Sequence, residues 1–232
     1  MTRDFETEKA TEQIECKSKS IKKLSCIKVF WIFMLGSVIG FIFEGVLALV
    51  KRGRWEHHSA TVWGPFCIIY GLGAVAVCLL SQALKDKHII IQFFAFALSG
   101  MAVEYFGSLF QEICFGSTSW DYSSHFMNIE GRVSLGMALV WGVFGIIFMK
   151  FIYTHIMVLL DLMHGRLFKI FSIYACIIMI INLVMSASAI MRWRARLESK
   201  PASNQIEEYL DSAYNDDTME RLFPNMVFHD QN

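Results

Sequence analysis

The sequence contains few charged residues, few prolines and no excess of charge of either sign. Only 18% of its 232 residues are Asp, Glu, Lys or Arg, and only 3 are proline. A soluble domain averages about 25% charged residues. The 21 basic and 21 acidic side chains cancel, which excludes the strongly basic surface of a nucleic-acid-binding protein. With 55% hydrophobic residues and a mean hydropathy of +0.44, the composition indicates an integral membrane protein.

Several chemical motifs are also missing. The 6 cysteines form no CxxC pair and mostly lie in or beside apolar runs, so we interpret them as small buried hydrophobic residues. There is no GxxxxGK[ST] phosphate loop, GxSxG elbow, HExxH pair or GxGxxG after a strand. An ATPase or a common hydrolase is therefore not encoded here, and we expect neither a metal site nor a cofactor.

Long apolar runs are what the sequence does contain. A membrane-crossing helix needs around 20 apolar residues, and a chain in lipid must satisfy its backbone hydrogen bonds internally. We therefore predict an all-α polytopic membrane protein with about five transmembrane helices. The runs are Ile27–Val50, Pro65–Leu84, Ile89–Phe110, Val133–Met149 and Leu167–Met191. Three regions follow: a polar N-terminal cytoplasmic segment 1–26, a transmembrane domain 27–191 and a polar C-terminal tail 192–232.

The distribution of Lys and Arg favours a cytoplasmic N-terminus, with 11 basic residues on the inner side against 8 on the outer side. We expect a multi-pass protein of the cell membrane. Five crossings place Arg192, Arg194 and Arg196 outside, against the positive-inside rule. The apolar stretch Tyr153–Gly165 offers an alternative, because as a re-entrant or sixth segment it would return the tail to the inside.

A faint internal duplication relates the first two helices to the next two. Gly40-x-x-x-Glu44 matches Gly100-x-x-x-Glu104 at an offset of 60 residues. At an offset of 65, Trp55 matches Trp120 and Gly71 matches Gly136. The interpretation is two parallel two-helix repeats plus one helix; the alternative is coincidence, since glycine is common in membrane helices.

Glu44 and Glu104 are the strongest functional candidates. Each lies 6 residues from the end of its apolar run, about 9 Å below the boundary, on the same side of the membrane. Carboxylates inside a membrane are costly and usually functional. We predict that the two share a polar cavity that binds a cation, a proton or a basic group. The alternative is that each is a packing residue, hydrogen-bonded to Ser37, Ser99, Ser108 or a loop arginine.

The second outer loop, Gln111–Arg132, is rich in polar and aromatic residues. Arg132 is the expected counter-charge for Glu104 or Asp121, because a guanidinium can bridge two acceptors; the alternative is an interfacial arginine. For Asp121, the alternative to a functional role is that it forms a simple Asx turn with its neighbours. The candidate site residues in this loop are Trp120, Asp121, Tyr122, Ser123, Asn128 and Arg132.

The first outer loop, Lys51–Gly64, begins with a basic cluster. We interpret Lys51, Arg52 and Arg54 as ligands of lipid phosphates. Gly64-Pro65 is expected to open the second helix, because proline is tolerated in the first helical turn. Tyr70-Gly71-x-Gly73 then gives that helix a thin face for close packing.

These motifs together resemble a known family. The chain from Val29 to Arg196 resembles the bacterial ABC transporter permease family with a CmpB-like domain, also called ABC-transporter type IV. The matching residues are Glu44, Gly64-Pro65, Tyr70-Gly71-Leu72-Gly73, Glu104, Ser108, Glu112, Trp120-Asp121-Tyr122-Ser123, Asn128, Gly131-Arg132 and Trp141-Gly142. Ile68 and His125 stand where the family usually has proline.

The resemblance implies a membrane subunit that moves a substrate with the help of a separate ATPase. The stretch Lys150–Arg166, expected to be a cytoplasmic link, would then be the docking place of that ATPase. Two other classes stay open. One is a membrane enzyme for lipid or prenyl-linked substrates, with Glu44 and Glu104 as acid and base and Arg132 holding a phosphate. The other is a non-catalytic membrane scaffold or sensor.

Overall fold

The computed structural model describes residues 24–229, so that almost all of the expected segment 1–26 lies outside the described residues. The described chain is mainly helical. In order, its elements are α2 (Cys26–Arg52), α3 (Ile68–Leu84), α4 (Ile89–Phe115), β1 (Ser117–Thr118), α5 (Leu135–Ile147), the π-helical turn η1 (Phe148–Ile152), α6 (Tyr153–Leu162), α7 (Arg166–Leu197), α8 (Gln205–Ala213), α9 (Asp216–Leu222) and β2 (Val227–Phe228).

Within the described residues, 4 helical stretches are long and apolar enough to cross a membrane: α2, α4, α7 and the continuous stretch Leu135–Leu162. They contain 27 to 32 residues, more than the roughly 20 that a bilayer requires. The apolar helix α3 is shorter, with 17 residues. The prediction of a polytopic all-helical membrane protein is confirmed, with α3 as the short fifth helix.

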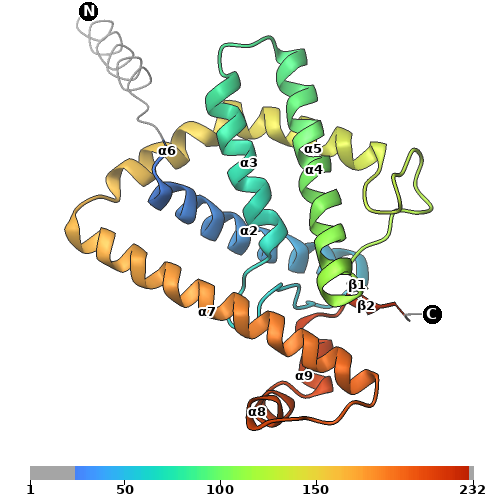
Figure 1. Cartoon of the computed structure of the whole chain (residues 1–232). Helices are drawn as coiled ribbons and strands as arrows, with labels where there is room; N and C mark the ends of the chain where they lie inside the picture. Colours follow the sequence, from blue (N-terminus) through green and yellow to red (C-terminus); the bar gives the residue numbers. More distant parts are fainter. Residues whose placement is uncertain (1–23, 230–232) are drawn as a thin grey trace, which may run out of the picture.

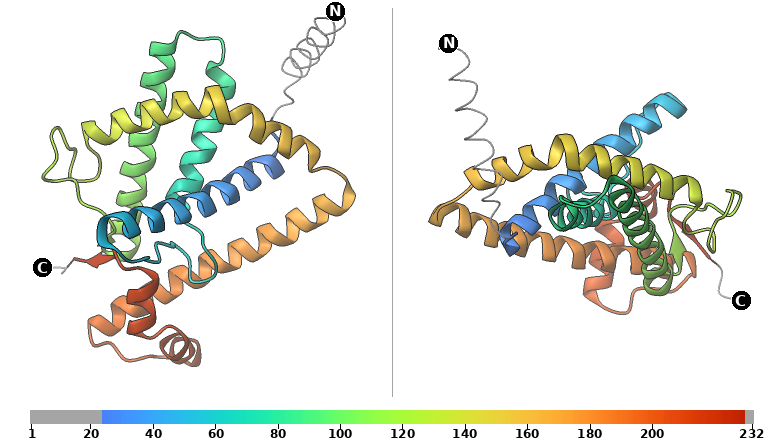
Figure 2. Two further views of the ribbon diagram at one scale, coloured as in Figure 1. Left: turned by 180° about the vertical axis from the view of Figure 1, so that it is seen from behind. Right: turned by 90° about the horizontal axis from the view of Figure 1, so that it is seen from above.

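Helices α2, α6 and α7 come together at one end of the molecule. Figure 1 shows that α2 begins close to the turn between α6 and α7, and that α7 and the α5–α6 stretch diverge from there. The hairpin of α3 and α4 crosses between α7 and the α5–α6 stretch, as the rear and top views show (Figure 2). The ends of α2, α4 and α7, and the start of α5, lie on the opposite side, which we call the loop end.

The fourth membrane helix is longer than predicted. The expected cytoplasmic link from Lys150 to Arg166 is helical as far as Leu162, through η1 and α6. The sequence from Phe148 to Leu162 contains neither glycine nor proline, so nothing there stops a helix. Only Met163, His164 and Gly165 connect it to α7. The prediction of a cytoplasmic link from Lys150 to Arg166 is wrong, and so is the alternative that Tyr153–Gly165 forms a separate sixth crossing.

The C-terminal tail is folded rather than a simple polar extension. α7 runs on to Leu197, and the helices α8 and α9 pack back on its last turns. Met219 is fully buried in this contact. The buried apolar residues are Ala189, Ile190, Trp193, Leu210, Tyr214, Met219 and Phe223.

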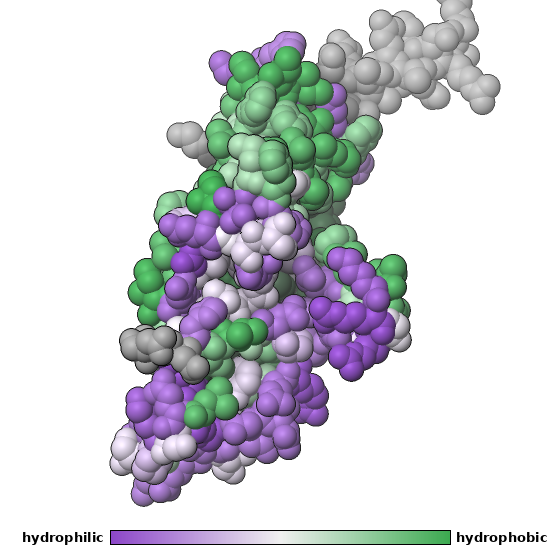
Figure 3. Space-filling model, turned by 90° about the vertical axis from the view of Figure 1, so that its right-hand side faces the viewer, coloured by the Kyte–Doolittle hydropathy of each residue, from purple (hydrophilic) through white to green (hydrophobic). Residues whose placement is uncertain are grey.

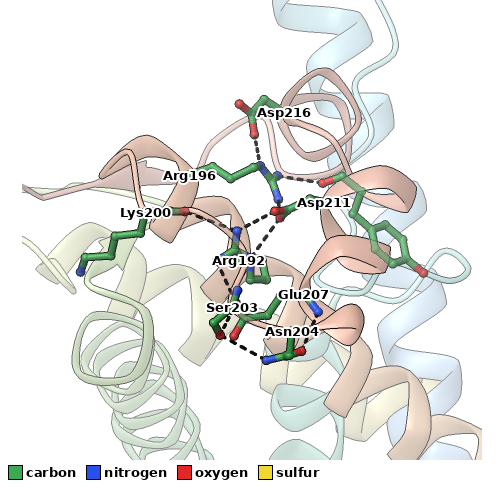
Figure 4. Close-up of polar contacts among 9 residues, drawn as sticks. Arg192, Arg196, Lys200, Ser203, Asn204, Glu207, Asp211 and Asp216 are labelled. Carbon is green, nitrogen blue, oxygen red and sulfur yellow. Dashed lines mark hydrogen bonds and ion pairs between the residues drawn. The ribbon is translucent and has the colours of Figure 1, made fainter.

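Ion pairs join α7 to the tail around Asp211 (Figure 4). Arg192 and Arg196 each approach Asp211 to 2.6 Å, and Arg196 also binds Asp216 at 2.7 Å. The hydrogen bond from Arg192 lowers the pKa of Asp211. Burial opposes this shift, but the hydrogen bond of Arg196 and the charges of both arginines keep the net shift downward. Two of the three arginines that conflict with the positive-inside rule are therefore structural partners of carboxylates in α8 and α9.

The tail also binds both outer loops. Strand β2 pairs with β1 in antiparallel fashion, with Ser117 opposite Phe228. Trp63 Nε1 donates to the hydroxyl of Tyr214 at 2.9 Å, which connects the first loop to α8. The tail and both loops consequently lie together at the loop end of the molecule. Figure 3 shows hydrophilic residues gathered over the tail and hydrophobic residues over the opposite half of the molecule.

Candidate functional site

The loop between α2 and α3 enters the helical core. Trp63 N donates to Asn182 Oδ1 at 3.1 Å, and Asn182 Nδ2 donates back to Trp63 O at 2.7 Å. Val62 N donates to Ser186 Oγ at 2.9 Å, and Cys67 N donates to Ser37 O at 3.0 Å. Asn182 is 15 residues from the end of α7, about 22 Å along the helix axis. The loop is thus re-entrant, which is possible because protein groups satisfy its backbone.

This loop changes the beginning of the second helix. α3 starts at Ile68, so Gly64-Pro65 lies in the re-entrant loop and does not open the helix as predicted. Gly64 has a φ of +77°, with the ring of Phe66 against it. A left-handed residue followed by proline makes a turn. The start of α3 is thereby placed deep in the molecule, beside the middle of α2.

Glu44 of α2 is bound by the first turn of α3. The hydroxyl of Tyr70 donates to Glu44 Oε1 at 2.5 Å. The ring of Tyr70 lies on Gly40, where an added Cβ would be 2.2 Å from Tyr70 Cβ. Gly71 fits as closely, because a Cβ there would be 2.2 Å from Ser37 Oγ. Only glycine lets the two helices approach so closely and lets the phenol reach the carboxylate.

Glu104 of α4 is bound by α5. Trp141 Nε1 donates to Glu104 Oε1 at 2.9 Å, and the residue is 7% exposed. The ring of Trp141 lies on Gly100, where a Cβ would come within 2.0 Å of it, and Gly73 of α3 faces the same ring. Glu104 Oε2 is buried and has no hydrogen-bond partner among the described residues. Such an oxygen is costly unless a ligand, a proton or water binds it.

The two glutamates are thus held in the same way. In each case a glycine one turn before the glutamate accommodates an aromatic ring from the following helix, and the ring donates a hydrogen bond to the carboxylate. This likeness supports the predicted duplication around Glu44 and Glu104. Elsewhere the pairs differ, because only α3 follows a re-entrant loop.

Tyr122 of the second outer loop lies near enough to both glutamates to be influenced by their charge. Burial raises the pKa of its phenol, and the negative charges of Glu104 and Glu44 raise it further. The hydroxyl therefore stays protonated and lies within electrostatic reach of both carboxylates. We call Glu44, Tyr70, Glu104, Tyr122 and Trp141 the glutamate cluster. That its members share one cavity stays a prediction.

Hydrogen bonds within the second outer loop fix the backbone around Tyr122. Asp121 accepts from the Ser123 backbone at 2.8 Å and from its hydroxyl at 2.9 Å, as in an Asx turn. Asn128 Nδ2 donates to Ser123 O at 2.9 Å, and Trp120 Nε1 donates to Arg132 O at 3.0 Å. Tyr122 N donates to Gly131 O at 2.7 Å. Most of these predicted site residues therefore build the loop that positions Tyr122.

Arg132 has other partners than predicted. It pairs with Glu112 and, at 3.3 Å, with Glu130, and it donates to Ser108 Oγ at 3.1 Å. The expected pairing with Glu104 or Asp121 is wrong. Ser108 and Glu112 lie one and two turns beyond Glu104 on the same face of α4, so Arg132 binds that face nearer the loop end. With its guanidinium thus occupied, a phosphate-holding role has no structural support.

The basic cluster of the first loop is also occupied. Arg52 and Arg54 both bind Glu56, Arg54 at 3.0 Å. Burial raises the pKa of Glu56, but the hydrogen bonds and charges of Arg54 and Arg52 outweigh it and the net shift is downward. These two arginines therefore stabilise the loop, and the binding of lipid phosphates by Lys51, Arg52 and Arg54 stays a prediction.

Four residues that hold the site were not singled out as its members. Trp141 and the hydroxyl of Tyr70 are the donors to the glutamates, and Asn182 and Ser186 hold the re-entrant loop. One available signal was the polarity of Asn182 and Ser186 within an otherwise apolar run. A buried polar residue in a membrane helix needs a partner.

The family model described as "Putative ABC-transporter type IV" matches residues 31–187 of this chain. Neither a curated protein nor a solved structure matches this chain. The matched range contains the re-entrant loop and every member of the glutamate cluster, and it ends before the folded tail.

Proposed function

The chain belongs to the ABC-transporter type IV family, and from this premise we propose that it is the membrane subunit of a transport system. We further propose that the glutamate cluster binds a cationic group of the transported substrate. The observation that carries the second proposal is the buried Oε2 of Glu104, which has no hydrogen-bond partner among the described residues.

The chemistry of the cluster favours a cation over an anion. Glu44 and Glu104 supply negative charge, while Tyr70, Tyr122 and Trp141 supply aromatic rings, which attract ammonium and guanidinium groups. Tyr70 and Trp141 each direct their donor to a glutamate. The remaining carboxylate oxygens are the acceptors that an ammonium group would use.

The re-entrant loop supports a transport role for the same region. Substrate sites of many transporters lie near the middle of the bilayer, where interrupted helices expose backbone groups. Here α3 begins beside the middle of α2, and its first turn carries Tyr70 of the cluster. A short helix that starts within the molecule after a re-entrant loop, with Tyr70 in its first turn, supports this proposal.

Transport by this family requires an energy source, and the chain contains no phosphate-binding loop. We propose that a separate ATPase subunit binds on the cytoplasmic side, which is the side where α2 begins. The previously expected docking link is mostly helix, so the connections left on that side are the α3–α4 turn and Met163–Gly165. Copurification of an ATPase that is lost when both turns are replaced by glycine and serine would support this arrangement; retention would contradict it.

Cation binding can be tested with the purified full-length protein in lipid nanodiscs. Ammonium, choline and putrescine serve as probes, and thermal unfolding is measured as each is titrated. A ligand at 100 times its dissociation constant stabilises the folded state by about 2.7 kcal/mol. We expect at least one probe to raise Tm, and we expect the double variant E44Q/E104Q to remove that rise.

The matched control is Glu208→Gln, which removes an exposed acid on α8 and should leave the rise unchanged. An equal Tm rise in E44Q/E104Q and the unmodified protein would contradict a role for the cluster. Absence of a rise with all three probes would contradict a cationic substrate group and leave the family assignment intact.

A further inference from the structure

A second candidate site lies near the start of α2, at the other end of that helix from Glu44. There α2, α6 and α7 come together (Figure 1). A cavity of about 480 Å³ is found there, within the usual range of about 300–1,000 Å³ for ligand pockets. It is lined by the first turns of α2, the last turn of α6, the Met163–Gly165 turn and the first turn of α7. Because it is built from helix ends, it lies at the membrane surface.

The rim of this cavity is basic. Lys28, His164 and Lys169 line it, together with a single acid, Asp161. Lys28 is paired with Asp161, and its side chain is only 14% exposed. This leaves the charge of Lys169 uncompensated by the lining residues. Arg166 in the same first turn of α7 adds a second positive charge beside the cavity. The local field therefore favours an anion.

The wall of the cavity is apolar and aromatic. Trp31 stacks on Phe168 at 5.8 Å and on Phe171 at 5.7 Å between ring centroids. Its indole N–H is already bound to Ser172 Oγ at 2.9 Å, so the ring presents an apolar surface. Leu160 and Met163 complete this side. A free phosphate ion would leave the apolar wall without a partner, whereas a lipid would cover it with its glycerol and acyl chains.

From this combination we infer that the cavity binds an anionic membrane lipid, with its phosphodiester headgroup at Lys28 and Lys169 and its apolar part against Trp31 and Phe168. Basic pockets between membrane helices are known to accept acidic lipid headgroups. This site lies at the other end of α2 from Lys51, Arg52 and Arg54, for which lipid binding was predicted from the sequence. This inference does not depend on the proposed transport function.

The test uses the full-length protein in detergent and measures dissociation constants by native mass spectrometry. The probes are dihexanoyl phosphatidylglycerol, dihexanoyl phosphatidylcholine and inorganic phosphate. We expect phosphatidylglycerol to bind more tightly than the other two. One basic residue near a membrane surface contributes about 1 kcal/mol to acidic-lipid binding, so Lys169→Gln should weaken binding of phosphatidylglycerol by about fivefold.

Two further variants sharpen this test: one should change the affinity in the opposite direction, and the other should leave it unchanged. Asp161→Asn frees Lys28 from its acid and should tighten phosphatidylglycerol binding by a similar factor. Lys85→Gln removes the same charge from the α3–α4 turn, outside the cavity, and should leave the dissociation constant unchanged. Equal affinity for phosphatidylcholine, equal affinity for inorganic phosphate, or equal effects of Lys85→Gln and Lys169→Gln would each overturn the inference.

Discussion

Two carboxylates inside a membrane protein determine the local structure around them. An intramembrane acid is expensive unless it is paired, and here each pairs with an aromatic donor instead of a cation. The donors neutralise no charge. Glu44 and Glu104 are therefore the groups that the proposed cation would bind, and Glu104 keeps one buried oxygen without a hydrogen bond among the described residues.

The variant Glu104→Gln should separate stability from binding. A glutamine oxygen can still accept from Trp141 Nε1, while a neutral amide nitrogen replaces the unpartnered carboxylate oxygen. Burying a neutral polar group costs less free energy than burying a charge that has no counter-ion, so we expect unchanged or increased Tm in detergent together with loss of cation binding. A fall in Tm would show that the carboxylate itself stabilises the fold.

The glutamates could be found from the sequence, and their partners could not. Their depth follows from the rise of a helix and their distance from a run end. Tyr70 is 26 residues from Glu44, and Trp141 is 37 residues from Glu104, so these contacts depend on helix packing. From the sequence, Arg132 is the expected counter-charge for Glu104 or Asp121, because a guanidinium can bridge two acceptors. The packed loop instead brings it to Glu112 and Glu130.

At the level of helix pairs, glycines determine which rings reach the glutamates. We predict that Gly40→Ala and Gly100→Ala each destabilise the protein by about 1–3 kcal/mol, as overpacking does. Their Cβ atoms would lie 2.2 Å and 2.0 Å from Tyr70 and Trp141. Displacement of the ring should also weaken cation binding, measured by the same probe titrations.

The control is Gly136→Ala in α5, where the nearest neighbour of an added Cβ is Ser134 Oγ at 3.9 Å. Alanine is the better helix former by about 1 kcal/mol, so this variant should be neutral or stabilising. If Gly100→Ala behaves like Gly136→Ala, the close packing of Trp141 on α4 does not exist in the membrane.

The re-entrant loop depends on two polar residues of α7. We predict that Asn182→Ala and Ser186→Ala loosen it, because Trp63 and Val62 lose the side-chain partners of their backbone N–H groups. In a variant that keeps Cys67 as its single cysteine, maleimide labelling should become faster. Ser188→Ala is the matched control, since Ser188 lies two residues further along α7; an equal acceleration there would argue against a specific anchor.

Hydropathy predicts which segments are helical better than it predicts how far they extend. The five apolar runs all form helices. The stretch from Lys150 to Arg166 was separated from the fourth helix because of its polar residues, yet it has no residue that ends a helix before Leu162. The re-entrant loop was missed for the opposite reason, since the run from Pro65 reads as continuous helix although the structure begins α3 at Ile68.

For the whole molecule, the contacts of the tail carry information that charge counting lacks. The tail pairs with the second outer loop through β1 and β2 and with the first loop through Trp63 and Tyr214. These contacts place the tail with the loops on one side, although Arg192 and Arg196 argue against that side by the positive-inside rule. Both arginines bind Asp211, so a folded tail explains why they occur there.

This arrangement predicts a labelling pattern for single cysteines in an otherwise cysteine-free protein. Ser124→Cys in the second loop and Ser212→Cys in α8 should react with a membrane-impermeant maleimide from the same side of sealed vesicles. Asp86→Cys in the α3–α4 turn should react only from the other side, and all three positions are exposed. Five helical passes with the tail docked on the loops require this pattern. Reaction of Ser124→Cys and Ser212→Cys from opposite sides would mean that the tail is separated from the loops by the membrane, and the β1–β2 pairing would then be excluded.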